Sequence, residues 1–320
     1  MFLTCALSIL AALVLVLLRE AITILRARAP RQAAVLRLGP APAMAQESLP
    51  VPRVIWTYWD TLPPPALVGR CLRLWKHVAP DHEIRLVDRV SAPGWLGAKI
   101  DATVFDALPA YRQADWLRLQ LLIRHGGIWM DGSTLLTTSL DWVHRLHREI
   151  GLGVVGFYID RYTVDRRCPV VENWFLAAPA RDPFLVAWAE ELDRALALGE
   201  AGYLDALRRE GMLEAVAQAI PEDMRSYLVM HLAASSVLQR APERFRLLLQ
   251  RAEDVAFAFH SALRWRKRHL YARLALTPQP RRTPALIKLR SGDRAVLERG
   301  LARGWIWRRS LLARLLEVAA

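Results

Sequence analysis

Short apolar runs alternate with amphipathic segments after residue 53, and this alternation constrains the fold more than any other feature. Val54–Trp59 is rich in β-branched and aromatic residues and is followed by Pro63–Pro65, which is typical of a buried strand that leads into a loop. A helix is expected around Leu67–Trp75, and Glu83–Asp88 predicts a second strand. A strand, a helix and another strand in succession predict a parallel α/β layer.

The alternation continues further along the chain. Residues Ala110–His125 contain neither Gly nor Pro and predict a helix that ends at Gly126 and Gly127, and Ile128–Met130 predicts the strand that follows. Two more strands are expected at residues 173–178 and 255–259, and two more helices at residues 184–198 and 227–239. The pattern as a whole favours an α/β domain.

Composition and charge exclude several classes of protein. The three cysteines (Cys5, Cys71 and Cys168) are too few for a disulfide framework, and no Cys or His has zinc-finger spacing. The net charge of +13 lies in residues 240–320, which hold 19 Lys and Arg against 6 Asp and Glu, whereas the residues before them balance. A nucleic-acid-binding module would explain only that part, and the chain carries no motif of that kind, so we expect no nucleic-acid partner.

The N-terminal segment has the properties of a membrane anchor. Residues 1–18 carry no charge, and as a helix these 18 residues would be about 27 Å long, close to the ~30 Å hydrocarbon thickness of a bilayer. Arg19, Arg26, Arg28 and Arg31 follow it and nothing basic precedes it, which favours an uncleaved anchor over a signal peptide. The positive-inside rule then predicts a single-pass protein of the inner (cytoplasmic) membrane with its domain in the cytoplasm. A helix buried in the core is the less favoured alternative, because the run is apolar on every face.

The basic C-terminal part has an amphipathic pattern. One face of a helix there would carry Leu301, Trp305, Leu312, Leu316 and Ala319. Together with the basic residues 264–269, such a helix suits an anionic membrane surface. The alternative is a terminal helix that packs its Trp face on the domain.

Charged residues also occur where a core would not place them. Asp115 and Arg118 lie three apart on the expected helix, so they share a face and suit a polyhydroxyl ligand, with a surface ion pair as the alternative. Asp131 directly follows an apolar strand, at the carboxyl end where open α/β sheets bind ligands. A carboxylate there suits a divalent ion that bridges a diphosphate, and the alternative is an Asp that ends a strand in a turn.

Three blocks in this order resemble the capsular polysaccharide synthesis proteins, which are related to glycosyltransferases with a DxD sugar-binding region. The blocks are residues 51–59 (VPRVIWTYW), 114–118 (ADWLR) and 126–131 (GGIWMD). Residues 172–175 (ENWF) and 227–231 (YLVMH) resemble later blocks of the same group. The resemblance runs from about Pro52 to beyond His231, and three spaced blocks are more specific than any one of them.

The resemblance implies a GT-A-like (Rossmann-type) nucleotide-sugar-binding fold and a retaining transfer from a nucleotide-sugar donor. Trp56, Thr57 and Tyr58 match the first-strand positions that cradle the nucleotide base, where an aromatic ring can stack. Asp115 and Arg118 match the pair that holds the hydroxyl groups of the donor sugar. These assignments are carried over from the family and do not follow from spacing.

The same resemblance implies a metal and a catalytic residue. Asp131 matches the first Asp of the DxD motif, which binds the sugar nucleotide and its ion, so we expect it to be catalytic and to ligate Mn²⁺ or Mg²⁺. Ser133 stands where the motif has its second Asp, and a hydroxyl is a weaker, neutral ligand, which lowers the expected affinity for the ion. Glu172, Asn173 and His231 are candidate contacts to donor or acceptor, with a strand-edge cap and a structural histidine as the alternatives.

These observations predict a membrane-anchored glycosyltransferase that moves a sugar to a growing surface glycan, capsular or other polysaccharide, or to a lipid-linked acceptor. The expected organisation is an anchor at residues 1–25, a linker at 26–50, a GT-A-like domain at 51–262 and a helical, basic region at 263–320. The expected partners are the donor, the glycan acceptor and the membrane. A polysaccharide-assembly factor that kept the fold and lost activity at Ser133 is the alternative.

Overall fold

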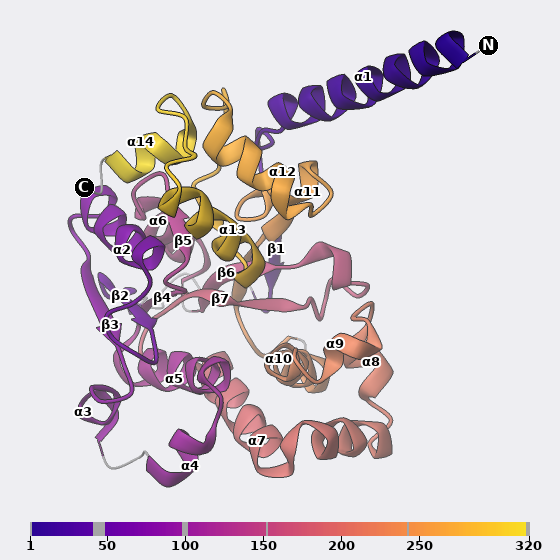
Figure 1. Cartoon of the computed structure of the whole chain (residues 1–320). Coiled ribbons are helices and arrows are strands. Elements are labelled where there is room, and N and C mark those ends of the chain that lie inside the picture. Colours follow the sequence, from indigo (N-terminus) through magenta and orange to yellow (C-terminus); the bar gives the residue numbers. More distant parts are fainter. Residues whose placement is uncertain (1, 41–48, 98–101, 152, 242, 318–320) are drawn as a thin grey trace.

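The computed structural model describes residues 2–40, 49–97, 102–151, 153–241 and 243–317. Its centre is a seven-stranded sheet in the order β1-β8-β6-β7-β4-β2-β3 (Figure 1). The strands are β1 (Val35–Leu38), β2 (Val54–Tyr58), β3 (Glu83–Val87), β4 (Gly127–Met130), β6 (Val154–Tyr158), β7 (Val171–Ala178) and β8 (Leu247–Arg251). A separate antiparallel pair joins β5 (Thr134–Leu136) to β9 (Leu286–Lys288).

The central sheet is mostly parallel. Strand β2 runs parallel to both β3 and β4, and β6 runs parallel to β8. Strand β7 is antiparallel to both β4 and β6, so those two strands and their parallel neighbours all point the same way. Only β7 and the edge strand β1, which is antiparallel to β8, point the other way in the described sheet. This mixed α/β arrangement is consistent with the GT-A-like fold that the resemblance implies.

Helices cover both faces of the sheet (Figure 1). One face packs against α5 (Ala110–His125), α7 (Pro183–Arg209) and α10 (Val229–Arg240), and the other packs against α2 (Ala66–Val78), α6 (Asp141–Ile150), α13 (Ser291–Ala302) and α14 (Leu311–Glu317). Successive side chains of a strand point to opposite faces, so Ile55 of β2 belongs to one core and Trp56 to the other. The short helices are α3 (Ala92–Leu96), α4 (Ala102–Ala107), α8 (Leu213–Ala217), α9 (Glu222–Arg225), α11 (Ala258–Ala262) and α12 (Lys267–Tyr271).

Two glycines turn the chain from α5 into β4. Gly126 has φ +65° and Gly127 has φ +107°, which side chains rarely adopt. A Cβ on Gly127 would stand 2.7 Å from the carbonyl oxygen of Val54, and a Cβ on Gly126 would stand 2.7 Å from the nitrogen of Ala180. The turn therefore has no room for a side chain at either position, and it fixes where β4 delivers Asp131.

Most of the expected elements are confirmed, and one strand is wrong. The helix at residues 110–125 has the predicted bounds, and the other expected helices and strands lie within a few residues of α2, β2, β3, β4, β7, α7 and α10, with α7 running on beyond its expected end. The strand expected at residues 255–259 is instead a turn that leads into α11, and the strand of this region is β8. A short apolar run that is buried on all sides does not reveal by its periodicity whether it is helix or strand.

The segments at the two ends of the domain also differ from expectation. Strand β1 lies within the expected linker and pairs with β8, so the described part of that segment adds an edge strand to the sheet. The single helix expected over residues 301–319 is wrong, because α13 ends at Ala302 and α14 begins at Leu311. Leu312 and Leu316 pack into the core, whereas Trp305 is 58% exposed. Ala319 lies outside the described residues.

The N-terminal helix α1 (Phe2–Arg26) projects away from the rest of the molecule (Figure 1). Its segment Leu7–Arg26 is 20 residues long, and its most apolar stretch is not buried in the structure at all. That length and composition are those of a membrane span or a signal anchor.

Candidate functional site

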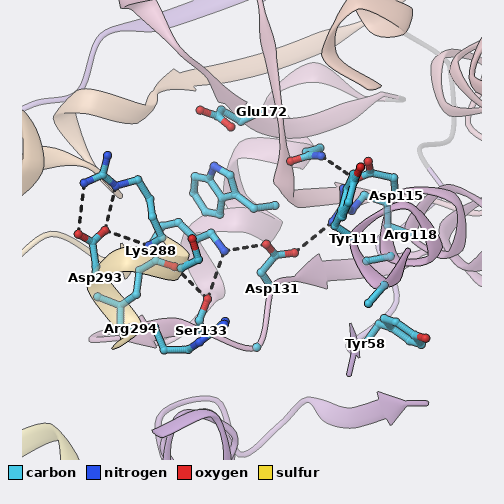
Figure 2. Close-up of a pocket in the computed structure, with 18 of the residues that line it drawn as sticks. Tyr58, Tyr111, Asp115, Arg118, Asp131, Ser133, Glu172, Lys288, Asp293 and Arg294 are labelled. Atoms are coloured by element: carbon cyan, nitrogen blue, oxygen red, sulfur yellow. Dashed lines mark hydrogen bonds and ion pairs between the residues drawn. The ribbon is translucent and has the colours of Figure 1, made fainter. Parts of the chain in front are cut away.

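A cavity of about 830 Å³ opens at the carboxyl ends of β2 and β4. The start of β7, the facing sides of α5 and α10, and the segment from β9 into α13 complete its walls. Eight expected site residues line it together: Tyr58, Asp115, Arg118, Asp131, Ser133, Glu172, Asn173 and His231. Figure 2 shows Asp131 near the middle, with Arg118 and Asp115 on one side and Lys288 on the other.

Asp115 lies at the centre of a buried ionic network on α5. Its carboxylate accepts hydrogen bonds from Arg112 Nη1 at 3.0 Å, from Arg118 Nη1, and from Asn173 Nδ2 at 3.0 Å. The side chains of Arg112 and Arg118 are only 2% and 4% exposed. Buried charges of this kind need partners, and here each guanidinium also reaches a second carboxylate, Glu200 for Arg112 and Asp131 for Arg118. The surface ion pair that was the alternative for Asp115 and Arg118 is thus a buried network that faces the cavity.

Asp131 sits between two cations. Its Oδ2 accepts a hydrogen bond from Lys288 Nζ at 2.7 Å, and its Oδ1 accepts from Arg118 Nη2 at 3.3 Å and from Trp129 Nε1 at 3.0 Å. Burial alone would raise the pKa of this carboxyl, but Lys288 and Arg118 outweigh burial and hold the pKa below its ordinary value. Asp131 is therefore ionised at neutral pH, and its charge is already compensated.

Ser133 and Lys288 are joined to each other. Ser133 Oγ donates to the backbone oxygen of Leu289 at 2.9 Å and accepts from Lys288 Nζ at 3.3 Å. The ammonium group of Lys288 thus bridges Asp131 and Ser133, the two residues that the resemblance matches to the DxD motif. Strand β5 follows Ser133 directly and pairs with β9, and this pairing is what places Lys288 over the motif.

Glu172, Asn173 and His231 form the wall between β7 and α10. His231 Nε2 lies 3.5 Å from Glu172 Oε2, and both side chains are at most 10% exposed. Asn173 Nδ2 donates to Asp115, as noted above, and also lies 3.3 Å from the sulfur of Met230. His231 therefore has the close acidic neighbour expected of a structural histidine while it also lines the cavity.

Aromatic side chains line the same cavity. Tyr58 and Trp59 extend from the end of β2, and Tyr111 and Tyr227 have ring centroids 5.6 Å apart. The guanidinium carbon of Arg294 lies 4.9 Å from the centroid of the Trp59 ring. Burial raises the pKa of Tyr58 to about 12, so this hydroxyl stays protonated at neutral pH.

Two expected base-binding residues lie elsewhere. Trp56 is fully buried in the core on the α5 side, where its Nε1 donates to the oxygen of Gly126 at 3.0 Å and its ring packs edge-on against Trp95. Thr57 is also fully buried, and neither residue lines the cavity. The ring of Trp56 therefore lies within the core between the sheet and α5, and Tyr58 is the residue of the three that lines the cavity.

One wall of the cavity is cationic and was not predicted from the sequence. Lys267, Lys288, Arg290 and Arg294 all line the cavity, although the nearest of them is 136 residues beyond Asp131 in the chain. Arg290 is held by Asp293, which also takes His260 Nε2 at 2.9 Å, and these two hydrogen bonds outweigh burial and hold the pKa of Asp293 well below its ordinary value. The one signal in the sequence was the excess of basic residues after residue 239, which we assigned to a membrane surface.

The donor set at Asp131 fits a divalent cation poorly. Such an ion takes several oxygen ligands at about 2.0–2.6 Å. Here both oxygens of Asp131 already accept hydrogen bonds from cations or from Trp129, and Ser133 offers only a hydroxyl. Within the part of the chain that the structure describes, no group of three or more His, Cys, Asp or Glu side chains is placed to hold a metal. An ion at Asp131 would also have to displace the ammonium group of Lys288.

Three comparisons relate this chain to known proteins. Residues 42–193 match the family described as capsular polysaccharide synthesis protein. The O-glycosyltransferase braB of Annulohypoxylon truncatum is 27% identical over 154 residues, which is 42% of this chain and 36% of that protein, so the chain spans about a third of the length of this curated relative. The solved structure of PaToxG glycosyltransferase aligns at 13% identity and a TM-score of 0.33, over 86% of this chain and 87% of that one. The family match confirms the expected resemblance, and together with the curated relative it supports a glycosyltransferase-related family.

Proposed function

We propose that this chain, which has relatives among the glycosyltransferases, is a membrane-anchored transferase with a GT-A-like fold. It takes a sugar from a nucleotide-sugar donor and adds it to a growing surface glycan or a lipid-linked acceptor, with retention. The observation that carries this proposal is the chain of contacts from Asp115 through Arg118 to Asp131 along one wall of the cavity. A buried ionic chain that faces a cavity of this volume suits a polar, charged ligand of the size of a sugar nucleotide.

Asp115 and Arg118 hold the hydroxyl groups of the donor sugar in this proposal. A carboxylate accepts hydrogen bonds from hydroxyl groups and a guanidinium donates to them, so the pair offers both kinds of partner. Arg112 and Asn173 fix the position of Asp115 from two sides. A fixed carboxylate selects the arrangement of hydroxyl groups on the sugar better than a mobile one, because binding costs less ordering.

The nucleotide base stacks on the aromatic side of the cavity. Tyr58, Trp59, Tyr111 and Tyr227 are among the rings that line it, and any base offers a face for such stacking. The buried ring of Trp56 supports the sheet beneath and takes no part. The base therefore lies near the end of β2, with the diphosphate beside Asp131 and the sugar beside Asp115.

The transfer exchanges one bond at the anomeric carbon for another. The bond to the β-phosphate oxygen breaks, and its electron pair stays on that oxygen. The acceptor hydroxyl oxygen bonds to the same face of the carbon, and its proton passes to the leaving diphosphate, so retention needs no nucleophile from the protein. Charge develops on the leaving phosphate, and positive side chains that are already in place stabilise it without reorganisation. Glu172 and His231 flank the acceptor side.

The anchor holds this site against the membrane surface. Glu20 of α1 accepts hydrogen bonds from Arg266 Nη1 at 3.0 Å and from His269, and Arg273 Nε donates to the oxygen of Ala27 at 2.8 Å. These contacts fix the end of α1 against α12 and its neighbours, so the basic residues 264–269 lie on the part of the domain near the anchor. The exposed Trp305 lies there too, because its backbone oxygen accepts a hydrogen bond from Tyr271 of α12. Such a surface suits the anionic cytoplasmic leaflet, where each basic residue adds ~1 kcal/mol.

A non-catalytic assembly factor is the second candidate. It is favoured by one observation, namely that Lys288 already neutralises Asp131 beside the substituted motif position Ser133. In that case the cavity would bind a sugar nucleotide or glycan without breaking a bond.

The test uses the full-length chain in detergent with a panel of nucleotide sugars, each with and without Mn²⁺, and follows release of the nucleotide. Hydrolysis is a slow side reaction that needs no acceptor. We expect release from one donor, and loss of that release in Asp131→Asn, because the carboxylate of Asp131 holds Lys288 and Arg118 in place. Asp205→Asn is the matched control, because Asp205 lies in an exposed ion pair with Arg208 on α7. Donor binding without release from any donor would favour the assembly factor.

A further inference from the structure

We propose that the ammonium group of Lys288 takes the place of the divalent cation, so that this chain binds the diphosphate of its donor without a metal. The inference rests on the proposed function, since it concerns the same donor. It differs from the resemblance, which implies a divalent cation, and it assigns the diphosphate as a ligand of Lys288, which belongs to none of the matched motifs.

The position of Lys288 Nζ is the first argument. It lies 2.7 Å from Asp131 Oδ2 and 3.3 Å from Ser133 Oγ, the two side chains at the DxD-like positions. An ion held by this motif would occupy the space between those two side chains. The side chain of Lys288 is only 12% exposed, so its charge is held in place by the surrounding protein. A fixed ammonium group there places an N–H donor where an ion would otherwise meet the phosphate.

The hydrogen-bonding capacity of the lysine is the second argument. An ammonium group has three N–H donors, and Asp131 and Ser133 take two of them. The third is left for a ligand in the cavity that Lys288 lines. Phosphate oxygens are strong acceptors for such a donor, and charge-assisted bonds of this kind are about twice as strong as neutral ones.

The neighbouring cations are the third argument. Arg294 and Lys267 line the same wall, and neither forms an ion pair within the described ranges of the chain. Arg118 and Lys288 carry two positive charges, and the carboxylates that they touch, Asp115 and Asp131, carry two negative ones, so these four side chains offer no net charge to a diphosphate. Arg294 and Lys267 therefore provide the excess positive charge, while Lys288 provides the contact at the motif.

The same geometry explains why Ser133 replaces a carboxylate. A second Asp at this position would be a further negative charge within reach of Lys288 Nζ, and it would compete with the phosphate for the ammonium group. A hydroxyl accepts one hydrogen bond from Lys288 and leaves the positive charge available. The departure from the DxD motif and the presence of Lys288 thus belong to one arrangement.

The test measures binding, by calorimetry, of UDP, GDP and other nucleoside diphosphates to the full-length chain in detergent. Each titration is run once with EDTA and once with Mn²⁺. We expect one nucleoside diphosphate to bind with the same Kd under both conditions. We also expect Lys288→Met to weaken that binding by about tenfold or more. Lys76→Met is the matched control, because Lys76 is an exposed lysine on α2 outside the cavity, and it should leave the Kd unchanged.

The outcomes separate this inference from the proposed function. Binding that requires Mn²⁺ would overturn the inference and leave the donor class intact, and this comparison uses only the unmutated chain, so it does not depend on the folding of a variant. An unchanged Kd in a folded Lys288→Met protein would also overturn it. Failure of every nucleoside diphosphate to bind under both conditions would remove the donor class and this inference together. A second readout is the EPR signal of free Mn²⁺, which we expect the chain alone to leave unchanged.

Discussion

Replacing Asp115 with alanine should destabilise the protein far more than replacing an exposed carboxylate. Asp115 is the shared partner of two buried guanidinium groups, those of Arg112 and Arg118. Removing one member of a buried ion pair costs about 3–5 kcal/mol, because the remaining charge is left without compensation. Arg112 keeps Glu200 at 2.8 Å and Arg118 keeps Asp131 at 3.3 Å, so we expect the lower end of that range.

The assay is urea unfolding of the full-length chain in detergent, followed by tryptophan fluorescence. Urea is preferred to guanidinium because it does not screen ion pairs. For Asp115→Ala we expect a loss of about 3 kcal/mol in the free energy of unfolding. The control is Asp205→Ala, whose pair with Arg208 has side chains 64% and 65% exposed, and for which about 0–1 kcal/mol is expected. If the two variants lose the same small amount, the network around Asp115 is solvated and the reasoning about a rigid sugar-binding carboxylate fails.

Three further outcomes follow from the structure. Gly127→Ala should lose more stability than Gly211→Ala, because both glycines have positive φ (+107° and +69°) but only the first Cβ would meet backbone, at 2.7 Å; equal losses in urea unfolding would contradict this. Burial, together with the charge of Arg53, lowers the pKa of His82 and of His144 to about 4, whereas the same side chains in the unfolded chain have a pKa near 6.5. The free energy of unfolding is therefore highest above pH 6.5 and falls as the pH drops toward 4. A His82→Gln, His144→Gln double variant should flatten that fall, and an unchanged slope would count against it. Trp305 is exposed, so Trp305→Phe should reduce the quenching of fluorescence by brominated lipids in vesicles, and undiminished quenching would place this residue away from the membrane.

The local pattern of the sequence was enough to locate one half of the site. The helix before Gly126 and the strand after it follow from propensity and from the two glycines, and they bring Asp115, Arg118 and Asp131 to one cavity wall. The helical period of 3.6 residues predicts that Asp115 and Arg118 share one face of the helix, and in the structure these two side chains form an ion pair. What periodicity does not give is burial, and the pair proved to be enclosed by Arg112 and Asn173.

The other half of the site depends on contacts between distant parts of the chain. Lys288 reaches Asp131 only because the three-residue strands β5 and β9 pair across about 150 residues of sequence, and so short a pairing leaves little trace in composition. For the same reason the excess of basic residues in the C-terminal part could be read from the sequence, but their position in the wall of the cavity could not. The alternation of side chains along β2 does not separate Trp56 from Tyr58, because both lie on the same side of the strand. Trp56 is enclosed in the core, whereas Tyr58, the last residue of β2, lines the cavity.

The most direct measurement of the central proposal is transfer of a labelled sugar. Membranes that contain the full-length chain are incubated with nucleotide sugars labelled in the sugar, and the label is followed into glycan or lipid-linked material. We expect one donor to pass its label to such an acceptor, and we expect the transfer to be lost in Asp131→Asn and retained in Asp205→Asn. A folded wild-type chain that binds a donor and passes label to no acceptor, with Asp131→Asn giving the same result, would contradict the assignment of a transferase.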